Sequence, residues 1–321
     1  MLKFTSFSDV ENLNDLIQEA LNIKRNPLQF QSLGKNKTLG LVFLNPSLRT
    51  RLSTEKAALN LGMHVIIINV NQESWAWEIR DGAVMNGTKV EHIKDAAAVI
   101  SQYCDLVGIR CFPSLTNREE DYNEQLLNQF ITYCSVPVIS LESATRHPLQ
   151  SFADLLTITE NWHRPERPKV LLTWAPHIKP LPQAVANSFS EWMRHAEVDF
   201  IITHPRGYEL HPDFTTGTKI CYNQEEGLQK ADFVYVKNWS SYHEYGKIVP
   251  ANDTEWLLNK EKLAVTNNAK IMHCLPVRRN VELIDELIDG ENSIILQQSH
   301  NRLFAAQGII KKMLEQILTT S

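Results

Sequence analysis

The chain has 321 residues, of which 43% are hydrophobic and 21% charged, and its formal net charge is −5. At roughly 150 residues per domain, this length predicts about two domains with enough apolar surface for a core, which excludes disorder as the main state. The slight acidic excess argues against a dedicated nucleic-acid binder but still allows a local basic pocket for a small anion.

The first half of the chain predicts helices that alternate with strands. Ser8-Asp9-Val10-Glu11 has the form of a capping box and is expected to open the first helix. Short apolar runs predict buried strands, and amphipathic patterns predict the helices that separate them. We expect helices over 8–24, 47–61, 95–103 and 119–133, and strands over 39–44, 64–70, 106–111 and 136–141.

The same alternation restarts in the second half. A helix is expected over 148–162, followed by a polar surface connection over 163–168. The expected strands are 170–174, 198–203, 219–222, 233–237, 271–275 and 294–297, and a last helix is expected over 301–318. Strands alternating with helices imply parallel βαβ units. The predicted fold is therefore α/β, with two doubly wound parallel-sheet domains joined by helices near residues 142–150.

Several common signatures are missing from the chain. It has no G-x-G-x-x-G, P-loop, nucleophile-elbow or H-E-x-x-H motif, and its five cysteines form no C-x-x-C pair. No metal and no cofactor are expected. The first residues lack a signal-peptide core, and the longest apolar runs are far below the ~18 residues of a membrane helix. We expect a cytoplasmic protein without membrane or nucleic-acid partners.

Three motifs carry candidate chemistry. The first is Ser47-Leu48-Arg49-Thr50-Arg51, where hydroxyls, arginines and a helix N-terminus suit a phosphate; the alternative is a capped helix with surface arginines. The second is His147-Pro148-Leu149-Gln150 with Asp154, just beyond a strand end, where open α/β sheets bind ligands; the alternative is a helix cap with a structural histidine. The third is His273-Cys274-Leu275-Pro276, whose backbone carbonyls can accept from an amine or amide.

Cys274 is not expected to be a nucleophile. Adjacent residues on a strand point to opposite faces, so His273 and Cys274 are poorly placed to form a dyad.

Together these motifs resemble the aspartate and ornithine carbamoyltransferase family, which has S-x-R-T-R, H-P-x-Q-x-x-x-D and H-C-L-P motifs in this order. The resemblance covers essentially the whole chain. Arg110 resembles the family's second phosphate arginine, Arg302 resembles its C-terminal arginine, and 89–95 resembles its mobile loop. It implies a carbamoyl phosphate-binding domain over 1–145, an acceptor-binding domain over 146–300, and a C-terminal helix over 301–321 that returns to the first domain.

One departure from the ornithine enzymes points to an acylated acceptor. Those enzymes carry an aspartate for the free α-amine and a Ser-Met-Gly loop, whereas here Lys237 follows the strand and the loop reads Asn238-Trp239-Ser240-Ser241. A lysine repels an ammonium group and attracts a carboxylate. This departure resembles the N-acylornithine branch of the family, and so does Asn45-Pro46-Ser47-Leu48 in the phosphate motif.

Two further segments resemble the same branch. Trp75 lies in a Ser74–Glu78 loop that, by the resemblance, enters a neighbouring subunit's site in a homotrimer; the alternative is a surface tryptophan. The proline-rich segment 174–182 resembles a loop that forms a backbone knot; the alternative is a plain rigid turn. Acetyl-specific members carry a glutamate where this chain has Val90. A neutral side chain there would not repel a succinyl carboxylate, so N-succinylornithine is favoured, although Val90 could merely pack in its loop with N-acetylornithine as the acceptor.

The resemblance implies a reaction and a set of site residues. A carbamoyl group passes from carbamoyl phosphate to the δ-amine of the acylornithine in arginine biosynthesis. Other acceptors such as putrescine, or a non-catalytic anion-binding relative, are the alternatives. The expected catalytic residues are Arg49, Thr50, Arg110, His147, Gln150 and Arg302. Carbamoyl phosphate is expected to contact these six residues and also Ser47, Leu48, Trp75, Cys274 and Leu275. The acylornithine is expected to contact Glu142, His177, Lys237, Arg278 and Val90.

Overall fold

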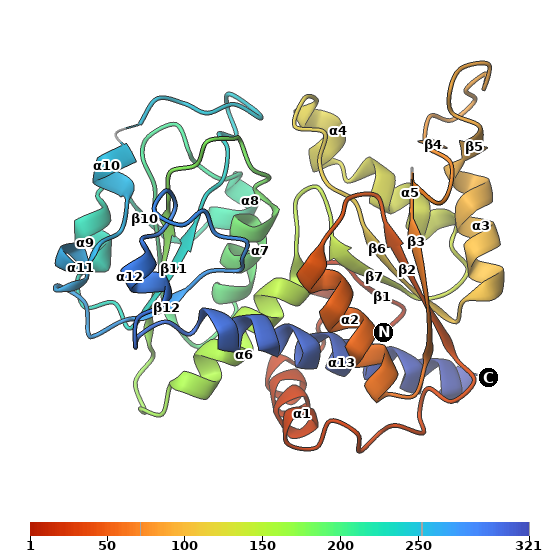
Figure 1. Ribbon diagram of the computed structural model, residues 1–321, viewed down its shortest axis with the longest axis horizontal. Coiled ribbons are helices and arrows are strands. Elements are labelled where there is room, and N and C mark those ends of the chain that lie inside the picture. Colours follow the sequence, from red (N-terminus) through yellow and green to blue (C-terminus); the bar gives the residue numbers. More distant parts are fainter. Residues whose placement is uncertain (71, 252, 321) are drawn as a thin grey trace. The chain divides into compact units, whose positions relative to one another are not determined.

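A computed structural model of the chain describes residues 1–70, 72–251 and 253–320 (Figure 1). By its internal contacts the chain divides into two compact units. The first unit comprises residues 1–114, 119–149 and 302–321, and the second comprises 115–118 and 150–301. The divisions at 149/150 and 301/302 fall inside two helices, α6 (Pro148–Asn161) and α13 (Ile295–Thr320). The last residue of the expected C-terminal segment, Ser321, lies outside the described residues.

The first unit contains a five-stranded parallel sheet in the order β1-β7-β6-β2-β3. A separate two-stranded sheet is formed by β4 and β5. The elements before α6 are β1 (Lys3–Phe4), the 3-10 helix η1 (Phe7–Asp9), α1 (Leu13–Arg25), β2 (Thr38–Phe43), α2 (Leu48–Asn60), β3 (His64–Asn69), β4 (Trp77–Glu78), β5 (Glu91–His92), α3 (Ile93–Tyr103), β6 (Leu106–Arg110), α4 (Arg118–Tyr122), α5 (Gln125–Tyr133) and β7 (Val138–Glu142).

The second unit contains another five-stranded parallel sheet, in the order β10-β9-β8-β11-β12. Its elements between α6 and α13 are β8 (Lys169–Trp174), α7 (Ala184–Met193), β9 (Asp199–Thr203), α8 (Pro212–Thr215), β10 (Lys219–Cys221), α9 (Gln224–Leu228), β11 (Phe233–Lys237), α10 (Asp253–Trp256), α11 (Lys260–Leu263), β12 (Lys270–Met272) and α12 (Asp285–Ile288). The predicted fold class, with two doubly wound parallel-sheet domains, is confirmed.

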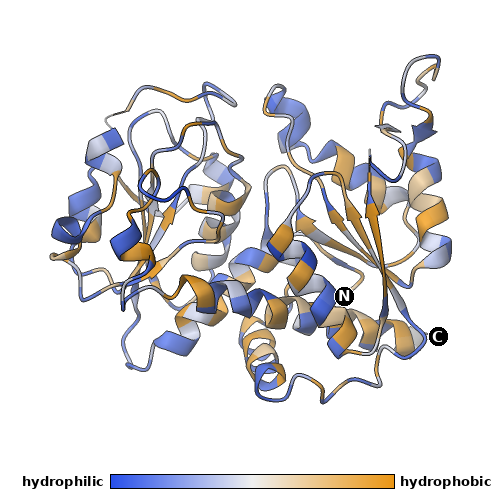
Figure 2. Cartoon of the chain, viewed as in Figure 1, coloured by the Kyte–Doolittle hydropathy of each residue, from blue (hydrophilic) through white to orange (hydrophobic). Residues whose placement is uncertain are grey.

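Each sheet supplies the buried centre of its own unit. The strands are predominantly hydrophobic along their length, and the longer helices show one hydrophobic and one hydrophilic side (Figure 2). In the first unit, α3 and α5 pack with side chains of β2 and β6, including Val42, Val107 and Ile109. In the second unit, Leu171, Val234 and Ile271 of three neighbouring strands share one core cluster. Among the described residues, no helix is both long enough and apolar enough to cross a membrane.

The strand order gives each sheet one switch point, where the chain reverses its direction of winding. In the first sheet this point lies between β2 and β6, and in the second it lies between β8 and β11. Open parallel sheets bind ligands at the carboxyl ends of the strands beside such a point. Those ends are followed by Leu44 and Cys111 in one unit and by Ala175 and Asn238 in the other.

Four predicted elements differ from the structure. The strand expected over 271–275 ends at Met272 as β12, so His273 and Cys274 lie just beyond it. The Asp9 carboxylate accepts hydrogen bonds from Thr5 N (2.7 Å) and Ser6 N (3.2 Å), which closes a short 3-10 turn, so the first α-helix opens at the next cap, Asn12. Glu124, at φ 50°, divides the expected helix 119–133 into α4 and α5. The strand expected over 294–297 is wrong, because only a single bridge forms beside β12 before Gln298 N bonds to Ile294 O and α13 begins.

Candidate active site

The first motif forms the N-terminus of α2, directly after the carboxyl end of β2. Ser47 is the N-cap, and its hydroxyl accepts from Thr50 N at 3.4 Å and donates to Thr50 Oγ1 at 3.0 Å. Thr50 is buried, Arg49 is partly buried and Leu48 is exposed. A helix N-terminus offers unpaired N–H groups and a positive dipole end, so this turn can hold an anion.

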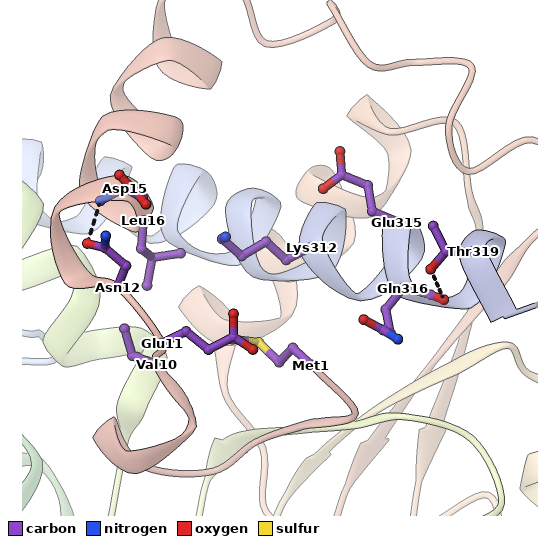
Figure 3. Close-up of a pocket in the computed structure, with 10 residues that line it drawn as sticks. All are labelled: Met1, Val10, Glu11, Asn12, Asp15, Leu16, Lys312, Glu315, Gln316 and Thr319. Atoms are coloured by element: carbon purple, nitrogen blue, oxygen red, sulfur yellow. Dashed lines mark hydrogen bonds between the residues drawn. The ribbon is translucent and has the colours of Figure 1, made fainter.

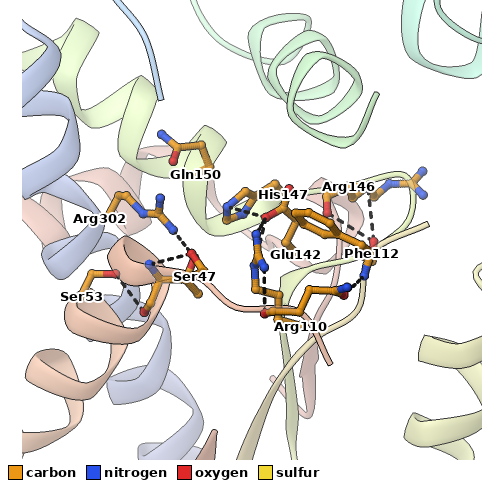
Figure 4. A network of polar contacts seen from close by, with 12 residues as sticks. Ser47, Ser53, Arg110, Phe112, Glu142, Arg146, His147, Gln150 and Arg302 are labelled. Atoms are coloured by element: carbon orange, nitrogen blue, oxygen red, sulfur yellow. Dashed lines mark hydrogen bonds and ion pairs between the residues drawn. The ribbon is translucent and has the colours of Figure 1, made fainter. Parts of the chain in front are cut away.

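Arg110 ends β6, the strand beside β2. Its guanidinium donates to the carbonyl oxygens of Asn45 (2.9 Å) and Pro46 (2.7 Å), which precede the α2 turn, and to Glu142 Oε2 (2.9 Å). Both members of this ion pair are buried. The pairing follows from the sheet, because Arg110 and Glu142 are register partners at the carboxyl ends of β6 and β7. Arg110 is therefore fixed at the switch point of the first sheet (Figure 4).

His147 lies against the same carboxylate, with its Nε2 3.6 Å from Glu142 Oε2. Burial, together with the positive charges of Arg302 and Arg110, holds the pKa of His147 well below its ordinary value of 6.5. The ring is therefore neutral at pH 7 even though a carboxylate is close. Its Nδ1 is buried and has no hydrogen-bond partner within residues 1–70, 72–251 and 253–320, so the ring keeps capacity for a ligand.

Arg302 joins this group from α13. Its Nη2 donates to Thr50 Oγ1 at 2.6 Å, and the side chain is buried (Figure 4). The first unit thus brings together Ser47, Thr50, Arg110, His147 and Arg302, all predicted from the sequence. Glu142, which was predicted to meet the acylornithine, lies in the first unit, where its carboxylate accepts from Arg110.

In the second unit, Lys237 ends β11 at the switch point, opposite Trp174 of β8. Its side chain is buried, and no described residue forms a hydrogen bond or ion pair with its ammonium group. Burial acts to raise the pKa of Glu282, but the neighbouring His273 ring and the charge of Lys237 lower it to about 2. Lys237 therefore already acts on one carboxylate, and its ammonium group can attract a carboxylate of a ligand in the same way.

His177 and Arg278 contact each other in the same unit. Arg278 Nε donates to His177 Nε2 at 3.0 Å, and His177 Nδ1 lies 2.7 Å from Lys179 O and 3.0 Å from Lys179 N. The imidazole thereby orients the guanidinium, which is suited to a carboxylate.

Gln150 and the 273–275 segment are linked through buried groups of the second unit. Gln150 Nε2 donates to Asp154 Oδ1 at 2.7 Å, and His273 Nδ1 accepts from Leu275 N at 2.9 Å. Leu275 has φ 56° and a cis peptide bond to Pro276. Cys274 is buried beside this turn, away from the surface.

Comparisons with known proteins identify the family. Residues 1–160 match the model described as "Aspartate/ornithine carbamoyltransferase, carbamoyl-P binding domain", and residues 182–313 match "Aspartate/ornithine carbamoyltransferase, Asp/Orn binding domain". The chain is 49% identical to the N-succinylornithine carbamoyltransferase of Bacteroides fragilis, over 99% of this chain and 100% of that protein. The chain belongs to the aspartate/ornithine carbamoyltransferase family. The predicted family and its N-acylornithine branch are confirmed.

Two further relatives support this placement in the family. The chain is 33% identical to the N-acetylornithine carbamoyltransferase of Xanthomonas campestris pv. campestris, over 95% of this chain and 94% of that protein. A solved glutamate-to-valine mutant of N-acetyl-L-ornithine transcarbamylase, complexed with carbamyl phosphate and N-succinyl-L-norvaline, has a TM-score of 0.90 at 32% identity; the match covers 98% of this chain and 100% of that one. The protein is a carbamoyltransferase.

Two predicted residues of this carbamoyltransferase lie on its surface. Trp75 is 66% exposed in the turn before β4, and Val90 is 58% exposed just before β5. The segment between β4 and β5 extends as a long loop (Figure 1). Neither side chain joins the buried groups described above, so any role in the site depends on movement of this loop or on another subunit.

Sequence reasoning missed residues that hold the predicted ones. Glu124 accepts from Ser143 Oγ (2.6 Å) and Thr145 N (2.8 Å) and so fixes the turn before His147. Gln298 and Glu282 contact the 273–278 segment. No local sequence pattern marks these residues. Each one contacts a distant segment of the chain, or depends on a partner residue, that becomes its neighbour only when the chain folds.

The described residues contain no group of three or more His, Cys, Asp or Glu side chains that could hold a metal ion. A hollow of about 300 Å³ lies in the first unit between α1 and the end of α13, lined among others by Glu11, Asp15 and Lys312 (Figure 3). It contains none of the predicted site residues, and we assign it no role in the reaction.

Proposed function

We propose that this carbamoyltransferase transfers the carbamoyl group of carbamoyl phosphate to the δ-amine of N-succinyl-L-ornithine, forming N-succinylcitrulline and phosphate in arginine biosynthesis. The observation that carries the acceptor is the buried Lys237 at the second switch point, which favours a carboxylate over a free ammonium group. The 49% identity to an N-succinylornithine carbamoyltransferase over the full chain supports the same acceptor.

Carbamoyl phosphate is proposed to bind through its phosphate to the α2 turn, with Ser47, the backbone of Leu48, Arg49 and Thr50, and to Arg110. These groups combine N–H donors, hydroxyls and guanidiniums, which suit a phosphate dianion. Support comes from the hydrogen bonds that hold Arg110 to the residues just before this turn.

The carbamoyl group itself needs both donors and acceptors. His147 and Arg302 are proposed to donate to its oxygen, and a neutral imidazole carries the one N–H that this requires. Gln150 and the backbone of Cys274 and Leu275 are proposed to accept from its NH₂ group. Charge on the oxygen of the tetrahedral intermediate is then stabilised by groups that are already oriented.

The acceptor δ-amine must be neutral to attack. Its lone pair forms a bond to the carbonyl carbon, the bond from that carbon to the phosphate oxygen breaks, and the amine loses one proton. A lysine-like pKa of about 10.4 leaves little neutral amine at pH 7, so the site must lower that pKa or remove the proton, and the departing phosphate is the proposed base. His177, Lys237 and Arg278 are proposed to hold the carboxylates of the acylornithine. Glu142 is proposed to meet the acylornithine as well, and its carboxylate also accepts from Arg110.

The acyl group is proposed to be succinyl because of Val90. A neutral side chain does not repel the distal carboxylate, whereas a glutamate at this position would. The glutamate-to-valine mutant of N-acetyl-L-ornithine transcarbamylase that holds N-succinyl-L-norvaline fits this argument. N-Acetyl-L-ornithine remains the second candidate acceptor, favoured by the 33% identity to an N-acetylornithine carbamoyltransferase.

A homotrimer in the cytoplasm is proposed as the working form, with Trp75 reaching a neighbouring site. The support is a set of exposed apolar side chains on α2 and the edge strand β3, namely Leu48, Leu52, Leu59 and Ile66. A backbone knot in the second unit is proposed as well. The 175–183 loop is hydrogen-bonded to the 237–240 segment, for example by Ser240 N to Leu181 O at 2.9 Å and by Asn238 Nδ2 to Ala175 O at 2.6 Å.

The acceptor is tested by comparing the formation of the citrulline product from N-succinylornithine, N-acetylornithine and ornithine at one carbamoyl phosphate concentration. We expect the highest kcat/KM with the succinyl compound and the lowest with free ornithine. Turnover of free ornithine above both acylornithines would refute the role of Lys237. Binding of carbamoyl phosphate without turnover of any acceptor would identify a non-catalytic relative.

The acyl preference is tested separately by Val90→Glu. The new carboxylate should lower kcat/KM for the succinyl acceptor by about tenfold or more and leave the acetyl acceptor less affected. Val84→Glu is the matched control, since Val84 is an exposed valine (79%) in the same segment. An unchanged succinyl-to-acetyl ratio in Val90→Glu removes position 90 from the account of specificity.

A further inference from the structure

A continuous chain of buried hydrogen bonds joins Gln150 to the 273–275 segment. Asp154 Oδ1 accepts from Gln150 Nε2 at 2.7 Å and from Gln298 Nε2 at 2.7 Å. Gln298 Oε1 then accepts from His273 N at 2.8 Å. All four side chains are buried, with exposures of 1% for Gln150 and 0% for the other three, and all lie in the second unit.

The chemistry of a carboxylate fixes which end of each glutamine faces it. Both hydrogen bonds end on the same accepting oxygen, Asp154 Oδ1, so both glutamines present their NH₂ groups to it. The carbonyl oxygen of Gln150 is therefore forced to face away. That Oε1 is buried and has no hydrogen-bond partner among the described residues. An unpaired buried acceptor is costly, and here it is available to a ligand N–H.

The same reasoning orients the other glutamine. With its NH₂ group on Asp154, Gln298 must turn its oxygen to the backbone N–H of His273. The His273 ring in turn accepts from Leu275 N at 2.9 Å. The residues on both sides of Cys274 are thus held by side chains, in a turn where Leu275 has φ 56°, a conformation that its side chain disfavours.

We propose that Gln298 is a positioning residue of the carbamoyl transfer. Through Asp154 it keeps the acceptor end of Gln150 directed to the ligand, and through His273 it holds the Cys274 and Leu275 carbonyls in place. These groups are the acceptors assigned to the two N–H bonds of the carbamoyl NH₂ group, so the inference rests on the proposed function. Gln298 itself touches no reacting atom.

The fold has other contacts that can tolerate a change at Gln298. Next to it, Asn301 Nδ2 donates to Thr157 Oγ1 (2.9 Å) and to Glu160 Oε2 (2.7 Å), which also join α13 to α6. Because these bonds remain, a substitution at Gln298 should disturb the orientation of its partners more than the packing of the two helices.

Gln298→Met tests the proposal, since methionine keeps the length of the side chain and removes both hydrogen bonds. Gln307→Met is the matched control. Gln307 lies on the same helix, is also 0% exposed, and also makes two side-chain bonds, from its Nε2 to Pro27 O (2.6 Å) and from Asn60 Nδ2 to its Oε1 (3.0 Å). We measure steady-state kinetics with N-succinylornithine together with the midpoint of thermal unfolding.

Gln298→Met should lower kcat/KM for carbamoyl phosphate by about tenfold to a hundredfold, because a small misplacement of ligating groups is enough for such a loss. Gln307→Met should stay within about twofold of the parent, with a comparable fall in unfolding midpoint. Equal kinetics in Gln298→Met and the parent would overturn the proposal, and so would an equal kinetic loss in both variants. A parent enzyme that forms no acylcitrulline refutes the proposed function instead.

Gln298→Glu provides a second test that does not depend on the methionine variant folding. Two facing carboxyl groups share one proton, and while the introduced carboxyl is protonated it keeps a donor toward Asp154 and an acceptor toward His273 N. As the pH rises and this proton is lost, the two carboxylates repel each other. The ratio of kcat/KM in Gln298→Glu to that of the parent should therefore fall between roughly pH 6 and pH 9, while the ratio for Gln307→Glu stays flat. A flat ratio for Gln298→Glu would contradict the proposal.

Discussion

His147 shows how the charge of a single residue follows from its surroundings. Its ring is buried beside the Arg110–Glu142 pair and Arg302, and its pKa lies well below 6.5. In the unfolded chain this histidine takes up a proton as the pH falls below 6.5. In the native protein the buried ring takes up its proton only at a lower pH. The stability gained from the neutral ring is therefore complete above pH 6.5 and is lost as the pH falls.

His147→Asn tests this linkage. Without the ring, the fall in unfolding midpoint between roughly pH 7.5 and pH 5.5 should be smaller than in the parent, since a buried histidine costs at most about 1.4 kcal/mol per pH unit in this range. Carbamoyl transfer should also be lost. His204→Asn is the control: His204 is buried in the second unit with a lowered pKa, so it should reduce the pH dependence while transfer persists. An unchanged pH dependence in His147→Asn would show that the pKa of this histidine is the same in the native and unfolded chain, which contradicts the prediction.

At the scale of one element, Ser47 caps α2 and also faces the proposed anion. Its hydroxyl accepts from Thr50 N, which satisfies one of the free N–H groups of the first turn. Aspartate caps a helix as well as serine does, but it adds a negative charge where phosphate is proposed to bind. Stability and ligand binding can therefore be separated at this residue.

We predict that Ser47→Ala lowers the free energy of unfolding by about 1 kcal/mol and that Ser47→Asp stays within about 0.5 kcal/mol of the parent. Affinity for carbamoyl phosphate, measured by isothermal titration, should be weaker in Ser47→Asp than in Ser47→Ala. Asn12→Ala is the control, because Asn12 caps α1 by accepting from Asp15 N at 3.2 Å, outside the candidate site. Tight binding by Ser47→Asp would exclude this turn as the phosphate site.

Elements with a strong periodic pattern could be predicted from the sequence, and those set by tertiary contacts could not. The strand ending at Arg110 and the α2 helix from Leu48 are where the apolar runs and the cap place them. Residues 294–297 are apolar enough for a strand, yet β12 offers them one bridge and the helix hydrogen bonds prevail. The candidate site motifs could be proposed from the sequence because each is a short local pattern that resembles one of the family.

The partners of those motif residues follow from the strand order and the packing of distant helices. The Arg110–Glu142 pair requires that β6 and β7 be neighbours in the sheet. The Asp154–Gln298 bond joins residues far apart in the sequence, on α6 and α13. Neither bond leaves a local pattern in the chain. The sequence could therefore nominate candidate substrate-binding residues, whereas the groups that orient these candidates become visible only in the fold.

At the scale of the whole molecule, the two sheets repeat one arrangement. In each, the candidate ligand groups follow the strands beside the switch point: Arg110 with the α2 turn in one unit, and Lys237 with the segment after Trp174 in the other. Trp75 is the one proposed site residue with a large exposed aromatic surface. Its position in the turn before β4 suits contact with a second copy of the chain, because an exposed tryptophan gains by burial in an interface.

This leads to a test by mixed assembly. Arg49→Ala and Trp75→Ala should each be nearly inactive alone. If Trp75 is supplied by a neighbour, a trimer reassembled from equal amounts of both contains roughly one quarter of its sites with Arg49 and the neighbour's Trp75 intact, so about a quarter of the parent activity should return. A mixture of Arg49→Ala with His147→Asn should recover nothing, because both residues belong to the same unit of one chain. If the first mixture is no more active than its separate components, Trp75 does not complete a neighbouring site. It is then a surface residue of its own subunit and no longer a proposed site residue.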